Sequence, residues 1–162
     1  MLQSAQAKTK SLPILVRCMV KRDVNDCIKI AAGRSEEPWT ARNFLDAMIA
    51  KNSVALVAEE VRNDGKIVIA GFIYYLIFGN RLEIVNAGVD KRFDGLGVSS
   101  ALLDKVKVRA TSRRKTRIVV HVCERFLDVQ LFLRSQGFKA VKVIRRFFGE
   151  DAAYRFAWEK TK

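Results

Sequence analysis

The stretch RFDGLGVSSALLDKV, residues 92–106, decides the fold because it joins a strand-like run to a helix-like run through two glycines. The run before it, residues 82–89, is apolar, partly β-branched and free of proline, which predicts a strand. In the run after it, apolar residues recur at helical spacing between charged ones, which predicts a helix that starts near Val98. Gly95 and Gly97 therefore lie in a corner between a strand and a helix.

Such a corner is a candidate anion site. The start of a helix has free N–H groups and a partial positive charge, and glycines let a ligand approach the backbone closely. No Walker string is present, and Gly95-Leu-Gly97-Val-Ser-Ser100 lacks the third glycine of a dinucleotide fingerprint. Ser99 or Ser100 can cap the helix. The motif alone leaves two alternatives open, a phosphate-binding loop and a simple tight turn.

The composition indicates one globular domain. The chain has 162 residues, of which 49% are hydrophobic and 29% are charged. We expect a loose tail at 1–12 and a single domain at 13–162. No apolar run is long enough to span a bilayer, and the N-terminus lacks the apolar core of a signal peptide. Three cysteines without a CxxC pair and a single histidine indicate reduced thiols in a cytoplasmic protein without a metal site.

The formal net charge of +13 is large for this length. It favours acidic partners such as RNA, ribosomes or phosphorylated cofactors. The alternative is a basic surface that only keeps the protein soluble, since the sequence contains no recognised RNA- or DNA-binding motif.

The remaining periodicities predict an α/β (α+β) fold with a mixed sheet of about seven strands flanked by helices. The expected strands are 14–20, 53–60, 67–78, 82–89, 117–123, 138–148 and 152–158. The expected helices are 23–32, 41–50, one that starts at 98, and 127–136. Thr40 is expected to cap the second helix, and Gly137 to end the last one.

This order of elements, with a glycine loop after the fourth strand, resembles the GNAT acetyltransferase fold over about residues 16–158. Within it, the ribosomal-protein-alanine N-acetyltransferases and related N-terminal acetyltransferases are the most similar. The motifs that carry the resemblance are Val89-Asp-Lys-Arg-Phe93 with Gly97 and Ala101-Leu-Leu103; Val122-Cys-Glu124 with Gln130-Leu-Phe132 and Gly137-Phe138; Glu150-Asp151-Ala152; and Pro38-Trp39-Thr40.

The resemblance implies acetyl-CoA as the cofactor, with its pyrophosphate on the backbone N–H groups of residues 94–100. In the family the fourth and fifth strands, here 82–89 and 118–123, splay apart. The acetyl thioester lies in that gap, and the amine enters from the other side. The implied cofactor contacts are Ala87, Gly88, Val89, Asp94, Gly95, Leu96, Gly97, Val98, Ser99, Ser100, Phe126 and Phe132.

His121, Glu83 and Glu124 are the candidate catalytic residues. By resemblance His121 takes the place of the family's base, and its ordinary pKa near neutrality suits that role. Without the resemblance it would be read as a hydrogen-bonded core or edge histidine. Glu83 can position water or the amine, or can be a solvated strand residue. Glu124 is a second base candidate, or merely begins a turn.

The sequence also departs from the family pattern. Asp94 replaces a Gln or Arg in the loop, and Ser99 replaces a Gly or Ala. Phe126 replaces an asparagine that often contacts the cofactor, and Leu133 replaces a tyrosine that often protonates the departing thiolate. Solvent can supply that proton, because a thiol pKa is only about 8.5. The link at 147–150 is shorter than the tyrosine-bearing loop of relatives that helps to hold a peptide N-terminus.

These observations predict an acetyl-CoA-dependent N-acetyltransferase acting on the α-amine of a protein or peptide, with a ribosomal protein as the leading acceptor. The alternatives are a small-molecule amine acetyltransferase and a degenerate GNAT domain that binds acyl-CoA or a partner without turnover. A basic RNA- or ribosome-binding module is a third hypothesis, which depends on charge alone.

Overall fold

The structure, a computed structural model, describes residues 13–35 and 38–161, so the expected tail at 1–12 lies outside the described residues. In chain order the elements are β1 (Ile14–Cys18), α1 (Val24–Ala32), α2 (Ala41–Ile49), β2 (Ser53–Val61), β3 (Ile67–Phe78), β4 (Arg81–Val89), α3 (Val98–Ser112), β5 (Arg117–Cys123), α4 (Leu127–Ser135), β6 (Lys139–Phe148) and β7 (Asp151–Glu159). Short 3-10 turns at Lys21–Asp23 and Lys91–Phe93 precede α1 and the glycine loop.

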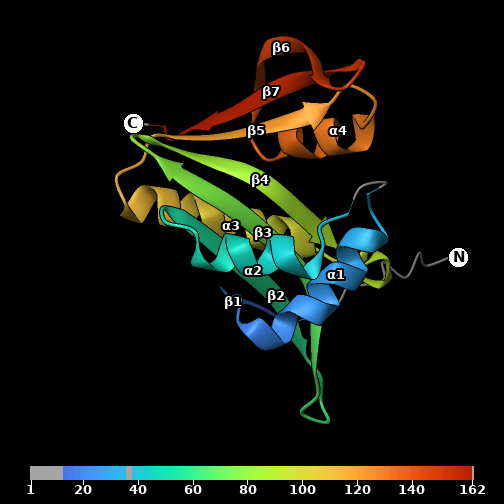
Figure 1. The fold of residues 1–162 in the computed structure, drawn as a ribbon. Coiled ribbons are helices and arrows are strands. Elements are labelled where there is room, and N and C mark those ends of the chain that lie inside the picture. Colours follow the sequence, from blue (N-terminus) through green and yellow to red (C-terminus); the bar gives the residue numbers. More distant parts are fainter. Residues whose placement is uncertain (1–12, 36–37, 162) are drawn as a thin grey trace, which may run out of the picture.

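The seven strands form one mixed sheet in the order β1-β2-β3-β4-β5-β7-β6 (Figure 1). β4 and β5 pair in parallel, and every other neighbouring pair is antiparallel. The chain crosses from β4 to β5 through α3, as a parallel connection requires. The predicted fold class, the strand count and the order of elements are confirmed.

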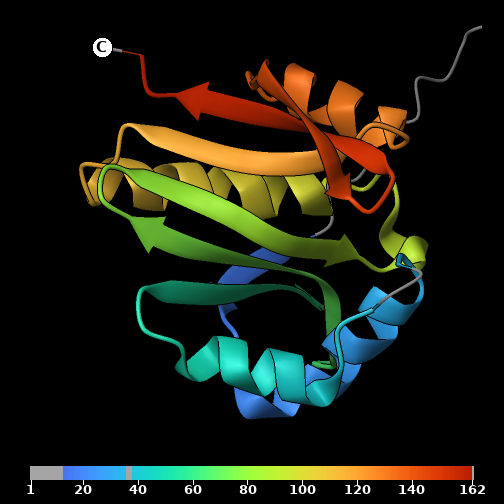
Figure 2. The same cartoon turned by 45° about the horizontal axis from the view of Figure 1, so that its top comes forward.

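Two helices cover each face of the sheet, but over different strands. α1 and α2 pack on β2 and β3 around an aromatic cluster in which Phe72 and Phe44 are fully buried. α3 and α4 lie on the opposite face and share the larger core with β2 to β5 and β7. In Figure 1, α1 and α2 lie in front of β2 and β3, and in Figures 1 and 2 no described helix lies on that face over β5, β7 and β6.

A buried ion cluster explains why β1 ends at Cys18 instead of reaching Val20. The carboxylate of Asp23 accepts the N–H of Val20 at 2.8 Å, which turns the chain into the first 3-10 turn. The same carboxylate accepts two hydrogen bonds from Arg17, at 2.7 and 2.9 Å, and Arg17 also donates to Glu59 at 2.8 Å. The cluster ties β1 to β2 and to the start of α1.

The helix starts agree with the sequence at α2 but not at α3. Thr40 caps α2 as predicted, since its side chain accepts the N–H of Asn43. The N-cap of α3 is Gly97, in the left-handed region at φ +85°, and no side chain caps it. The prediction that Ser99 or Ser100 caps this helix is wrong, because the turn at Gly97 lets the helix begin at Val98 and places both serines in its first turn.

Candidate active site

β4 and β5 separate partway along their length, and a bulge in β4 explains why. The parallel pairing of the two strands ends at Ile84 and Val120. On its other side β4 has one extra residue, Val85, because Tyr74 of β3 pairs with Asn86 and the next residue of β3 pairs with Ile84. A bulged strand bends and twists more strongly, so β4 turns away from β5 beyond this point. We call the divergence of residues 85–89 from 121–123 the fork.

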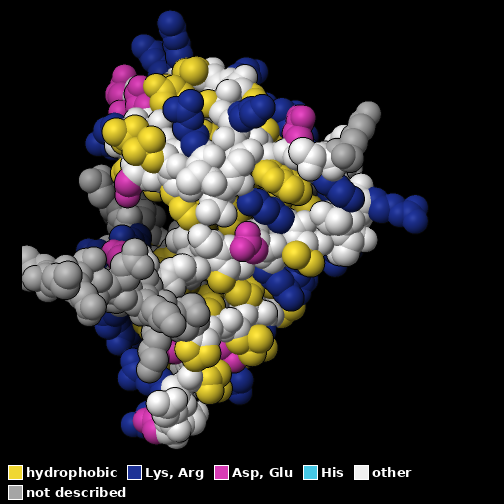
Figure 3. All heavy atoms as spheres, turned by 180° about the vertical axis from the view of Figure 1, so that it is seen from behind, with side chains coloured by type: hydrophobic (Ala, Val, Ile, Leu, Met, Phe, Trp, Pro, Cys, Tyr) yellow, Lys and Arg dark blue, Asp and Glu magenta, His cyan; other side chains and the backbone are white. Residues whose placement is uncertain are grey.

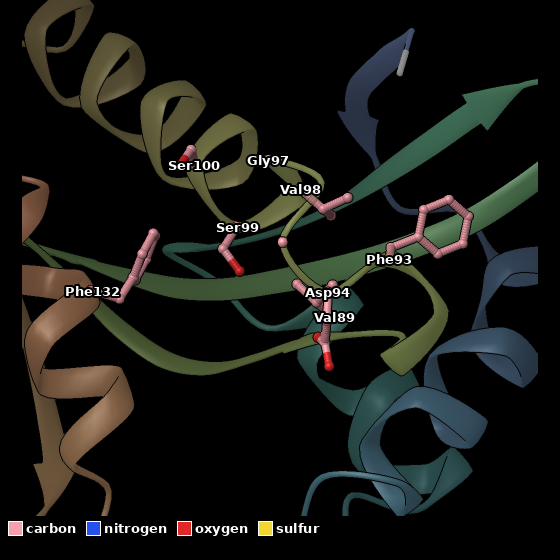
Figure 4. A pocket seen from close by; sticks show the side chains of 9 residues that line it. Val89, Phe93, Asp94, Gly97, Val98, Ser99, Ser100 and Phe132 are labelled. Atoms are coloured by element: carbon pink, nitrogen blue, oxygen red, sulfur yellow. The ribbon is translucent and has the colours of Figure 1, made fainter. Parts of the chain in front are cut away.

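A pocket of about 330 Å³ lies at the open end of the fork. Its lining comes from the end of β4, the glycine loop, the first turn of α3 and one side chain of α4: Val89, Phe93, Asp94, Gly95, Gly97, Val98, Ser99, Ser100 and Phe132. In Figure 4, Phe132 reaches in from α4, while Asp94 and Val89 lie across the pocket from it, below the glycine loop. Along β4 the pocket lies about 13 Å from the start of the fork.

The glycine loop leaves an open cradle at the start of α3. Gly95 and Gly97 have φ values of +73° and +85°, and a Cβ added to either would meet no protein atom within 4 Å. The first N–H groups of a helix have no intrahelical partner, so those of Val98, Ser99 and Ser100 face this opening with the positive end of the helix dipole. This geometry fits the pyrophosphate of a nucleotide cofactor.

The unusual Asp94 of the loop is neutralised by a residue that the sequence did not indicate. Arg34, just beyond α1, pairs with the Asp94 carboxylate through Nη2 and donates from Nε to the carbonyl of Val89 at 2.8 Å. The negative charge expected beside the cofactor phosphates is therefore balanced within the site. Nothing in the local sequence reveals this pair, because its members are far apart in the chain.

Eight of the twelve predicted cofactor residues line the pocket, and the other four do not. Ala87 and Gly88 lie deeper in the fork, on the edge of β4 that β5 has left. The N–H of Leu96 is already bonded to the carbonyl of Phe93, at 3.2 Å. Phe126 is exposed at the start of α4.

The two neighbouring residues of α4 have separate roles. Phe132 lines the pocket, whereas Leu133 is buried in the core. The side chain that α4 presents to the pocket is thus a phenylalanine ring, which carries no proton to donate. Phe93, which is not among the cofactor contacts that the resemblance implies, also lines the pocket and anchors the loop to the core, where it is 4% exposed.

His121 is the first residue of β5 beyond the last pair with β4, so it lies at the point where the fork opens. Its side chain is 11% exposed. The ring of Phe147 from β6 stacks on it, with centroids 4.7 Å apart and planes 15° apart. Nε2 accepts a hydrogen bond from Nε of Arg155, the residue opposite on β7, at 3.0 Å. Because an arginine Nε–H can only donate, Nε2 carries the lone pair and Nδ1 carries the proton.

Glu83 lies on the other side of the imidazole. Its Oε1 is 3.8 Å from Nδ1 of His121, which is longer than a hydrogen bond, and its Oε2 is 3.5 Å from Arg81. Burial and then the charge of Arg155 lower the pKa of His121, and the opposing effect of the Glu83 carboxylate is too small to reverse this. The imidazole is therefore neutral at neutral pH, the form that a proton acceptor needs.

Glu124, the third candidate, is engaged elsewhere. Its Oε1 accepts the N–H of Ala152 at 2.9 Å, and its own N–H donates to the carbonyl of the same residue. These bonds join the end of β5 to the start of β7. The alternative that Glu124 begins a turn therefore describes its position better than a role at the fork.

The basic residues do not gather into one patch on the face seen in Figure 3. Lys and Arg side chains are spread over that face from end to end, with acidic and apolar side chains between them. The view gives no defined track for a nucleic acid backbone. No helix within residues 13–35 and 38–161 has the length and apolar character needed to cross a membrane.

Comparison with known proteins identifies the fold. The E. coli ribosomal-protein-S18-alanine N-acetyltransferase superposes with a TM-score of 0.79 at 16% identity, over 92% of this chain and 95% of that one. Ard1 from Thermoplasma volcanium superposes with a TM-score of 0.79 at 19% sequence identity, over 92% of this chain and 99% of that one. PaiA N-acetyltransferase from Thermoplasma acidophilum, solved with coenzyme A, superposes with a TM-score of 0.74 at 16% sequence identity, over 92% of this chain and 100% of that one. Among curated proteins none has significant sequence similarity to this chain.

The forked sheet and the open helix start thus belong to an N-acyltransferase fold. The model of the acetyltransferase (GNAT) family matches residues 22–138, and the chain belongs to this family. The predicted resemblance is confirmed. The enzyme class is that of N-acetyltransferases, which use acetyl-CoA as the acetyl donor.

Proposed function

We propose that this protein transfers the acetyl group of acetyl-CoA to the α-amine at the N-terminus of a protein or peptide. The observation that carries the proposal is the position of His121, a neutral imidazole at the opening of the fork and on the face that α1 and α2 leave uncovered. An acceptor can reach this face without crossing the core. The similar fold of an enzyme named for an alanine of ribosomal protein S18 supports a ribosomal acceptor, and the +13 charge suits work beside ribosomes in the cytoplasm.

The cofactor would lie along the fork with its pyrophosphate on the N–H groups of Gly97 to Ser100. Bound there, it supplies an acetyl thioester whose C–S bond breaks as the new C–N bond forms. Phe132 would shield the bound arm from water, and the free edge of β4 beyond Val85 has backbone groups for its amides.

His121 would accept the proton that an ammonium group must lose before its nitrogen can attack. The second proton leaves the nitrogen as the amide forms and is taken up, through solvent, by the departing thiolate. Glu83 would hold a water beside Nδ1 of the imidazole, since its Oε1 lies 3.8 Å from that atom. No described tyrosine lines the pocket, so solvent is the proposed acid.

The acceptor test uses one peptide that begins with alanine followed by glutamate and contains one lysine, together with its N-terminally blocked copy. Thiol release and product mass are measured with acetyl-CoA. We expect acetylation of the free α-amine alone, and a fall in kcat of about 10²–10⁴-fold in His121→Gln. Acetylation of the lysine, or full activity of His121→Gln, would contradict the proposal.

Calorimetric titration with acetyl-CoA tests the loop separately. Gly97→Glu places a carboxylate in the cradle and should abolish binding. Gly65→Glu is a matched control in the β2–β3 turn: its φ of +80° is close to that of Gly97, and its Cβ also meets nothing within 4 Å. Loss of binding in both variants, or in neither, would remove the loop from the cofactor site.

A further inference from the structure

Arg155 occupies the nitrogen of His121 that a base must have free. The hydrogen bond at 3.0 Å uses the lone pair of Nε2, and the proton on Nδ1 faces Glu83. Neither ring nitrogen can accept a proton in this arrangement. If His121 is the base, Arg155 must leave Nε2 during each turnover, and something must make that movement favourable.

Arg155 has no carboxylate partner among the described residues. This sets it apart from arginines such as Arg17, Arg34 and Arg117, which each pair with an acidic side chain. Its cross-strand neighbour on β6 is Lys142, another cation. A guanidinium is a planar fork that fits a carboxylate, and within the described residues Arg155 donates only its Nε–H, to His121.

An irregularity in β6 places Phe147 against His121. The β6–β7 pairing is irregular between Ile144 and Phe148, and within the irregularity Arg146 has a left-handed φ of +53°. Bulges re-aim side chains, and this one lays the Phe147 ring on His121. The stacked ring limits access to the imidazole from that side and leaves the Arg155 edge as the route to Nε2.

We propose that Arg155 is a specificity-determining residue, which binds a carboxylate placed next to the acceptor amine and by doing so releases Nε2 of His121. The inference rests on the proposed function and names its substrate class: acceptors with a carboxylate a few ångströms from the amine. An acidic side chain at the first or second residue of a peptide supplies this group, and so does the α-carboxylate of a free amino acid.

The steps conserve charge and protons. The acceptor carboxylate replaces the imidazole lone pair as the partner of the Arg155 guanidinium, and no covalent bond changes. Nε2 then takes one proton from the neighbouring ammonium, and the neutral amine is left to attack. An acceptor without the carboxylate leaves Arg155 on Nε2, so its amine stays protonated beside a blocked base.

The first test compares peptides that differ only by Glu or Gln at the first or second residue, with free glutamate as a separate arm. We expect kcat/KM for the acidic peptide to exceed that of its amide twin by about tenfold or more, as for a charged hydrogen bond. In Arg155→Gln this ratio should fall to near one. Lys66→Gln, in the β2–β3 turn, removes one positive charge far from the fork and should keep the wild-type ratio.

Different failures have different meanings. Equal rates for the acidic and amide peptides in the wild type would overturn this inference and leave the proposed function intact. Acetylation of neither peptide, in a protein that binds acetyl-CoA, would contradict the peptide acceptor. If free glutamate is acetylated and neither peptide is, the result would support the role of Arg155 in binding a carboxylate and would identify the acceptor as a free amino acid.

The second test needs no turnover. His121 is the only histidine of the chain, so its imidazole NMR signal is assigned without ambiguity. The charged groups that face it are Glu83 and Arg81 on β4 and Arg155 on β7, while β6 contributes the Phe147 ring. Removal of the Arg155 charge should raise the pKa of His121 in Arg155→Gln, and Lys66→Gln should leave it unchanged. An unaltered pKa in Arg155→Gln would overturn the contact.

Discussion

The strands β2 and β6 are similar in length but lie in opposite halves of the sheet, and their environments differ throughout. The central residues of β2 are buried between helices on both faces, whereas every residue of β6 except Ile144 is exposed. Val57 on β2 is fully buried, and Val143 on β6 is 58% exposed. The half built from β1 to β4 is a two-sided core, and the half built from β5, β7 and β6 is covered on one face only.

This difference separates stability from chemistry. The covered half holds most of the large buried side chains and the Arg17–Asp23–Glu59 cluster. The open half carries His121, Arg155 and Phe147 on its uncovered face. The fork lies at the boundary, so a rigid sheet positions a site that an acceptor can reach. Variants in the two halves should therefore affect different properties.

The largest effect is expected from Asp23→Ala in the covered half. Asp23 is 2% exposed, and its loss leaves the Arg17 guanidinium with Glu59 as its one acidic partner among the described residues. Removal of one member of a buried ion cluster typically costs about 3–5 kcal/mol in the free energy of unfolding. Urea denaturation measures this loss. Asp64→Ala, in the exposed β2–β3 turn, is the control and should cost about 1 kcal/mol, the size of the hydrogen bond that its carboxylate accepts from the N–H of Lys66. Similar losses in both variants would contradict the role of the cluster.

A matched pair of valines tests the comparison directly. Val57→Ala should lower the free energy of unfolding by about 2–3 kcal/mol, because it removes fully buried methyl groups and leaves a cavity. Val143→Ala removes the same atoms from a mostly exposed site and should change the free energy of unfolding by about 0.5 kcal/mol or less. Thermal or urea unfolding distinguishes these values. Equal losses would show that β6 is covered in solution.

The pH dependence of stability should also follow the covered half. Burial alone would raise the pKa of Asp23, but the hydrogen bonds from Arg17 and from the N–H of Val20 outweigh it and hold the pKa below the usual value. A carboxyl group with a depressed folded-state pKa stabilises the fold above its unfolded pKa, about 3.9, and loses this contribution as the pH falls through the folded value. We expect the free energy of unfolding to drop below about pH 4. In Asp23→Ala this acid-dependent drop should be smaller, and an identical drop would assign it to other carboxyl groups.

The smallest effect is expected at Arg146 in the open half. Its left-handed φ of +53° is costly for a residue with a side chain, and glycine adopts it freely. Arg146→Gly should therefore change the free energy of unfolding by less than about 1 kcal/mol. The substitution relieves backbone strain in the folded state, but glycine also gives the unfolded chain more conformational entropy, and the two effects oppose each other. The near-ultraviolet spectrum and His121 titration should remain those of the wild type if the bulge persists. A loss of more than about 2 kcal/mol would show that the side chain itself holds β6 in place.

Most of the elements could be predicted from the sequence because their signals are local. The apolar run of β3, the Thr40 cap of α2 and the glycine after α4 depend on nearest neighbours, and the structure places these elements within a few residues of the prediction. The wrong cap at α3 has a local cause as well: serines favour the cap position, but the left-handed Gly97 had already ended the turn.

The sequence by itself thus determined the order of strands and helices, the glycine loop and the single histidine. Each of these follows from short-range spacing or composition. The tertiary structure alone decided the partners: Arg34 on Asp94, Arg155 on His121, and Glu124 on the start of β7. These contacts join residues that are distant in the chain, and they depend on strand order, register and a bulge. No local pattern encodes them, because side-chain pairing across a sheet is set only when the strands align.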